Sequence, residues 1–124
     1  MRIGVYDLGA MVVRLDVRKG LGAEFDMGAR PQARICVGLG GSWPEVVSRL
    51  FHEAFEAVCA VSETRWRPGT DYSYSSSNWL FVLTHEQMAE AVAQVGHFAA
   101  KVLPALAKAY RAVNRKPKHK PKRR

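Results

Sequence analysis

The fold is decided by the stretch SWPEVVSRLFHEAFEAVCA, residues 42–60, which has the pattern of an amphipathic helix. Ser42 and Glu45 are three residues apart, the spacing of a capping box that closes the first helical turn. Pro44 suits that turn, where its missing N–H would have no partner in any case. Apolar residues then recur at helical spacing, which predicts a stripe that covers a sheet. The stripe consists of Val47, Leu50, Phe51, Ala54, Phe55 and Val58.

The segment before this helix reads as a series of strands. Val13, Leu15 and Val17 alternate with charged residues, which is the period of a half-buried strand. Short turns separate the candidate strands, so we expect an antiparallel meander of three to five strands with one covered face. The expected strands are residues 2–8, 11–19, 23–27 and 32–39.

Residues 79–83 form a short apolar run, typical of a strand buried on both faces. Thr84 and Gln87 make a second capping box, and a long helix follows to about residue 114. Pro104 predicts a kink, or a break near residues 100–103. The resulting class is α+β, a small antiparallel sheet covered by an amphipathic helix and a long Pro-kinked C-terminal helix. The long helix has a heptad-like seam of Met88, Val92, Val95, Ala99, Val102, Leu106, Tyr110 and Val113, widened by Phe98 and Leu103.

The chain has 124 residues, 48% of them hydrophobic, which suits one domain with one core. We expect the α+β domain to span residues 1–113 and a basic, disordered tail to span 114–124. The sequence predicts neither a membrane span nor a signal peptide, so the expected location is the cytoplasm of the expressing or infected host cell. Cys36 and Cys59 are predicted to be reduced and buried.

His52, Glu53 and Glu56 lie on the predicted helix in a pattern that resembles the H-E-x-x-H helix of the zincin metallopeptidases, with Glu56 in place of the second histidine. Small phage and bacterial proteins of the minimal zincin type are similar in placing such a helix after a strand, and they continue into a second helix opened by an acidic residue, as at Glu86. The resemblance implies that His52 and Glu56 bind Zn²⁺ and that Glu53 acts as the general base.

An ordinary solvated helix face explains the same three residues. On a helical wheel, His52 and Glu56 lie beside Glu45 and Arg49, away from the apolar stripe, and could form ion pairs with spacing of four residues. No third ligand stands out in the sequence, so absence of a cofactor is favoured and Zn²⁺ is the alternative. The candidates for a third ligand are Asp71, His85, Glu86, Glu90 and His97.

The net charge of +8 is concentrated at the C-terminus. Residues 114–124 hold seven of the 19 basic residues, which leaves 12 basic against 11 acidic residues in the rest of the chain. Such a tail suits neutralisation of nucleic-acid phosphates without reading of sequence; the alternatives are solubility or docking to an acidic partner. The residues of the tail that carry this charge are Arg115, Lys116, Lys118, Lys120, Lys122, Arg123 and Arg124.

A second candidate surface for nucleic acid is an aromatic cluster flanked by arginines, whose alternative is packing at the edge of the core. It comprises Trp66, Tyr72, Tyr74, Trp79, Arg65 and Arg67. The leading functional hypothesis is a non-enzymatic accessory binding protein of phage or prophage type. Its partner would be nucleic acid or an acidic nucleoprotein. One version of this hypothesis is that the protein inhibits a nucleic-acid or defence machine of the host. The alternatives are a minimal zinc-dependent hydrolase of zincin type and an oligomeric assembly component that self-associates through the long helix.

Overall fold

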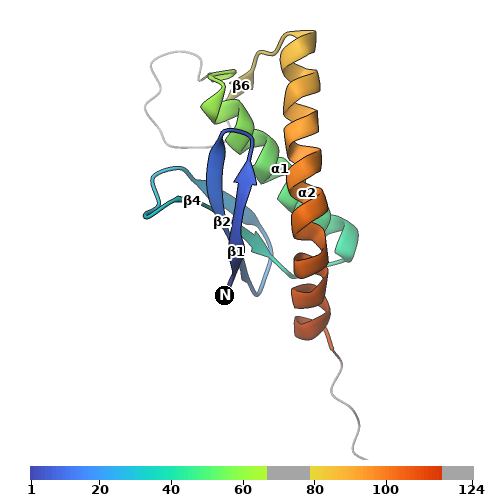
Figure 1. Cartoon of the computed structure of the whole chain (residues 1–124). Coiled ribbons are helices and arrows are strands. Elements are labelled where there is room, and N and C mark those ends of the chain that lie inside the picture. The colour runs from blue at the N-terminus through green and yellow to red at the C-terminus, as the bar shows by residue number, and fades with distance from the viewer. Residues whose placement is uncertain (67–78, 116–124) are drawn as a thin grey trace, which may run out of the picture.

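The computed structural model describes residues 1–66 and 79–115, and it places two helices against one face of a four-stranded sheet (Figure 1). The α+β class predicted from the sequence is confirmed. In chain order the elements are β1 (Arg2–Leu8), β2 (Met11–Arg18), β3 (Ala23–Asp26), β4 (Ala33–Gly38), α1 (Trp43–Val61), β5 (Arg65–Trp66), β6 (Leu80–Phe81) and α2 (His85–Val113).

The main sheet has the strand order β1-β2-β4-β3. The β1/β2 and β3/β4 pairs are antiparallel, but β2 and β4 are parallel, so the expected antiparallel meander is wrong in this detail. After β2 the chain crosses to the far edge and forms β3, which leaves the place beside β2 for β4. The crossing segment is tied down by backbone hydrogen bonds, from Gly38 N to Gly22 O at 2.8 Å and from Gly40 N to Gly20 O at 2.7 Å.

The predicted alternation of the strands is confirmed, because Val13, Leu15 and Val17 of β2 are all buried. Ile35 and Val37 of β4 face the same side. Both helices cover this face, with α1 over β3 and β4, and α2 beside α1 and β1. All of these elements contribute to a single core.

Helix α1 begins as the sequence predicts, since both hydrogen bonds of the capping box are present at Ser42 and Glu45. Its buried face, however, is rotated from the predicted stripe: Phe51 is exposed, and Glu53 is buried. The reason is that α1 packs against the sheet on one side and against α2 on another, so the buried arc lies between these two directions. The buried residues are Val46, Leu50, Glu53, Ala54, Ala57, Val58 and Cys59.

Helix α2 runs without interruption from His85 to Val113, so the predicted break near Pro104 does not occur. Pro104 is exposed, and its ring removes only one hydrogen bond from the solvent side of the helix. The middle of the predicted seam packs into the protein's own core, whereas Met88 and Val92 remain exposed. Self-association through α2 stays a prediction.

The run at residues 79–83 is not the doubly buried strand that the sequence predicts. Only Leu80 and Phe81 pair, with β5, and both side chains are exposed because this two-stranded sheet lies outside the main sheet. Both cysteines are free and buried, as expected. Within the described residues, no helix is long and apolar enough to cross a membrane.

Candidate metal centre

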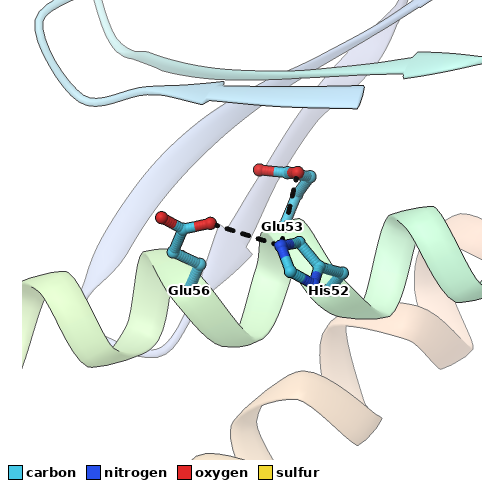
Figure 2. Close-up of side chains that lie close together, drawn as sticks. All are labelled: His52, Glu53 and Glu56. Atoms are coloured by element: carbon cyan, nitrogen blue, oxygen red, sulfur yellow. Dashed lines mark ion pairs between the residues drawn. The ribbon is translucent and has the colours of Figure 1, made fainter. Parts of the chain in front are cut away.

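Three side chains of α1 converge at one place on its surface (Figure 2). Their potential ligand atoms, on His52, Glu53 and Glu56, all lie within 4.8 Å of one another. The His52 Nε2 atom is 3.5 Å from Glu56 Oε2 and 3.9 Å from Glu53 Oε1. In the described part of the chain, this is the only group of at least three His, Cys, Asp or Glu side chains close enough to hold a metal ion.

The helix itself accounts for part of this arrangement. Residues four apart lie one above the other on a helix, so His52 and Glu56 share a face, and Glu53 is turned toward β3. The prediction that all three face water is therefore wrong for two of them. The side chain of His52 is 72% exposed, whereas those of Glu53 and Glu56 are only 10% and 14% exposed.

The ion pairs predicted for a solvated face are also only partly present. The His52–Glu56 pair forms. Arg49, however, donates to the carbonyl oxygens of Gly38 at 2.8 Å and Gly40 at 2.6 Å, instead of pairing with Glu45. Arg49 thus fastens α1 to the end of β4 and fixes the helix that carries the cluster.

Glu53 is the unusual member of the cluster. Burial raises the pKa of its carboxyl above the ordinary value of 4.5, and the negative charge of Glu56 raises it further, while His52 opposes both effects. Within residues 1–66 and 79–115, no hydrogen bond reaches this carboxylate. Glu53 also lines the small cavity beside the helix, and neither of its carboxylate oxygens is among the fully enclosed polar atoms without a partner. Water or an ion can therefore reach this mostly buried side chain from the cavity.

Glu56 is held from the opposite side by a residue that follows the helix. Its Oε1 atom accepts a hydrogen bond of 2.9 Å from Arg65 Nη1, which leaves Oε2 directed toward His52. The Arg65 guanidinium in turn lies over the ring of Trp79, 4.2 Å from the ring centre. Arg65 therefore orients Glu56. No sequence pattern predicts this contact, because the two residues lie nine positions apart across the end of the helix.

A small cavity of about 160 Å³ opens beside the cluster, between α1 and β3. Its walls are the three cluster residues together with Ala23, Glu24 and Phe25. Glu24 is already paired with Arg34 at 3.2 Å and with Arg18 at 3.6 Å. The cavity is large enough for an ion and at least one water, which occupies about 30 Å³ in the liquid.

The donor set fits a small divalent cation. With bonds of about 2.1 Å, two ligands of a tetrahedral zinc ion lie roughly 3.4 Å apart. The two distances from His52 Nε2 are 3.5 Å and 3.9 Å, and side-chain rotation would close the wider separation of up to 4.8 Å. Two carboxylates beside one guanidinium also leave a net negative charge at the cluster, which favours a cation.

The other predicted ligands are not part of this group. His85, Glu86, Glu90 and His97 all lie on α2 and do not join the cluster, and Asp71 lies outside the described residues. Comparisons of the chain with protein-family models, with curated proteins and with solved structures gave no match. The chemistry of the cluster thus has to follow from its own residues.

Of the predicted anion-binding surfaces, the structure describes only parts. Arg115 follows α2 directly and is exposed, whereas Lys116, Lys118, Lys120, Lys122, Arg123 and Arg124 lie outside the described residues. In the aromatic cluster, Trp66 is 52% exposed and Trp79 contacts Arg65, while Arg67, Tyr72 and Tyr74 also lie outside the described residues.

Proposed function

We propose that this protein binds a divalent cation through His52, Glu53 and Glu56, with Zn²⁺ as the best match. The observation that carries the proposal is the mostly buried Glu53 side chain, which has no hydrogen-bond partner in the described residues, lines the small cavity and lies 3.9 Å from His52 Nε2. A cation between the three ligands would balance the two carboxylates and remove the energetic penalty that burial imposes on Glu53.

Three protein ligands would leave one side of the ion open toward the cavity, as in catalytic zinc sites. When bound, the cation would supply a Lewis acid at that side. The alternative, enzymatic form of the proposal is a hydrolase of zincin type, in which only His52 and Glu56 would hold the ion and Glu53, instead of binding it, would accept a proton from water. A raised carboxyl pKa suits that role, because a general base works best when its pKa approaches the working pH.

Equilibrium dialysis against zinc, followed by metal analysis, tests the proposal. We expect one zinc per chain in the wild type, loss of zinc in His52→Ala, and retention in His97→Ala, which removes an exposed histidine from α2. Glu53→Gln separates the two roles of Glu53. If Glu53 is a ligand of the ion, this variant loses zinc; if Glu53 acts only as the general base, the variant keeps it. A wild type that takes up no stoichiometric zinc, or a His52→Ala variant that binds equally well, contradicts the proposal.

A second candidate function is contact with nucleic acid, and the charge distribution along α2 favours it. The first turns of the helix carry Glu86 and Glu90, whereas from Lys101 to the end of the chain there are ten basic residues and no acidic one. Lys101, Lys108, Arg111 and Arg115 of this basic arm are described, and all are exposed. We propose that the arm contacts the phosphates of nucleic acid or of a nucleoprotein, in a non-enzymatic accessory protein of phage type.

Binding of duplex DNA and of RNA over a salt series tests this second function, with the full chain compared to a chain lacking residues 116–124. Each phosphate contact that is lost should reduce the slope of log affinity against log salt by about 0.9 for duplex DNA. Truncation should therefore weaken binding most at low salt. Equal affinity and equal slope in the two chains would exclude the arm as the binding element.

A further inference from the structure

A groove of about 420 Å³ lies between α1 and α2, next to the candidate metal centre. Ser48, Phe51 and Phe55 of α1 form one wall, and Val92 and Val95 of α2 form the other. The ring of Phe55 packs against the ring of Phe81, with 6.0 Å between the ring centres. The groove is open to solvent, since Phe51 is 39% exposed and Val92 is 59% exposed.

His52 joins this groove to the cluster. It lines the groove together with Phe51 and Phe55, and it also lines the small cavity beside Glu53 and Glu56. A molecule that extends from the groove past the exposed His52 ring would reach an ion held there with one end, while its other end contacts the phenylalanines.

The charge at that end follows from the residues around the ion. A divalent cation would balance the carboxylates of Glu53 and Glu56, and the Arg65 guanidinium would then leave a net charge of about +1, if His52 is neutral as a ligand. An anionic oxygen is thus the favoured partner of the ion. The groove favours an apolar group instead, because its walls are aromatic and aliphatic apart from Ser48 and His52.

We infer that the protein binds a carboxylate that carries an aromatic or branched aliphatic group, with the carboxylate at the ion and the apolar group in the groove. This inference rests on the metal site proposed above. The groove volume falls within the range of about 300–1,000 Å³ that is usual for small-molecule sites. Amino acids with large apolar side chains, and peptides that end in one, belong to this class of ligand.

Calorimetric titration of the zinc-loaded protein with phenylpropionate tests the inference. We expect binding to the wild type, no measurable binding of phenylpropanol, which lacks the carboxylate, and at least about tenfold weaker binding of acetate, which lacks the apolar group. Removal of zinc should weaken the binding of phenylpropionate by a similar factor.

Val92→Asp tests the groove itself, because Val92 lines it, is exposed and is not a ligand. This variant should keep its zinc and bind phenylpropionate at least about tenfold more weakly. Val113→Asp, at an exposed position of the same helix outside the groove, should change neither property. If the wild type takes up zinc but not phenylpropionate, or if Val92→Asp binds it equally well, the groove inference alone is wrong. If the wild type takes up no zinc, the metal site and the groove inference both fail.

Discussion

Replacing Glu53 by glutamine should stabilise the metal-free protein at neutral pH and at the same time abolish its stabilisation by zinc. The variant keeps the shape of the side chain but removes the charge of a mostly buried residue that has no hydrogen bond among the described residues and lies 3.9 Å from the mostly exposed His52. A buried polar group without a partner destabilises a protein by about 1–3 kcal/mol. Glutamine remains polar, so we expect a net gain of about 1 kcal/mol, or roughly 4 °C in melting temperature for a domain of this size.

The raised pKa of Glu53 determines how the stability difference between the variant and the wild type changes with pH. The pKa of Glu53 is raised in the folded state, mainly by burial, so the folded protein binds the proton more tightly than the unfolded chain. The stabilising effect of the proton is complete below the ordinary pKa of 4.5 and is lost as the pH rises through the raised value. The advantage of Glu53→Gln over the wild type should accordingly be larger at pH ~7.5 than at pH ~5.

Thermal unfolding followed by circular dichroism measures both effects. Metal-free samples with a chelator should show the variant as the more stable protein. At free zinc about 100-fold above the dissociation constant, the wild type should gain about 2.7 kcal/mol, whereas the variant should gain little. Glu63→Gln, which removes an exposed carboxylate, is the matched control and should resemble the wild type throughout. The reasoning is refuted if Glu53→Gln is less stable than the metal-free wild type at neutral pH, or if the difference is the same at both pH values.

Four further substitutions test the contacts around the site and the fold. Arg65→Met should destabilise the metal-free protein by about 3 kcal/mol, because it leaves the mostly buried Glu56 without its cation, and saturating zinc should reduce this loss in the same unfolding assay. Arg49→Ala should cost about 2 kcal/mol in denaturant unfolding by removing the charged donor of two backbone carbonyls; an unchanged midpoint would show that water replaces it. Gly38→Ala should destabilise by about 1–3 kcal/mol, because a Cβ there would lie 2.6 Å from the carbonyl oxygen of Gly20. Gly96→Ala, in open space on α2, should stabilise by about 0.5–1 kcal/mol, and equal effects at the two glycines would contradict the close packing of residues 20–22 against Gly38.

Local sequence signals predicted the elements of this fold well. The capping boxes at Ser42 and Thr84 fixed the starts of both helices, because each depends on residues only three positions apart. The alternation around Val13, Leu15 and Val17 located a strand and its buried face. The same alternation could not distinguish a parallel from an antiparallel neighbour, since both bury every second residue. The parallel pairing of β2 and β4 was therefore missed.

In the candidate site, too, some features follow from local sequence and others only from tertiary packing. The spacing of His52 and Glu56 was sufficient to place them on one face of a helix, because that relation belongs to the helix alone. The sequence could not show that Glu53 is buried, because its burial depends on where the sheet and α2 meet α1. The bond from Arg65 to Glu56 likewise arises only when the chain turns back after the helix.

The sequence by itself thus determined the starts of both helices, the four strands of the main sheet and the shared face of His52 and Glu56, all of which depend on neighbours within a few positions along the chain. Only the tertiary structure decided the parallel strand pair, the buried carboxylate of Glu53 and the groove beside His52. These features depend on which distant segments pack together, and the hydrophobic effect that drives this packing is non-directional, so periodicity alone does not specify it.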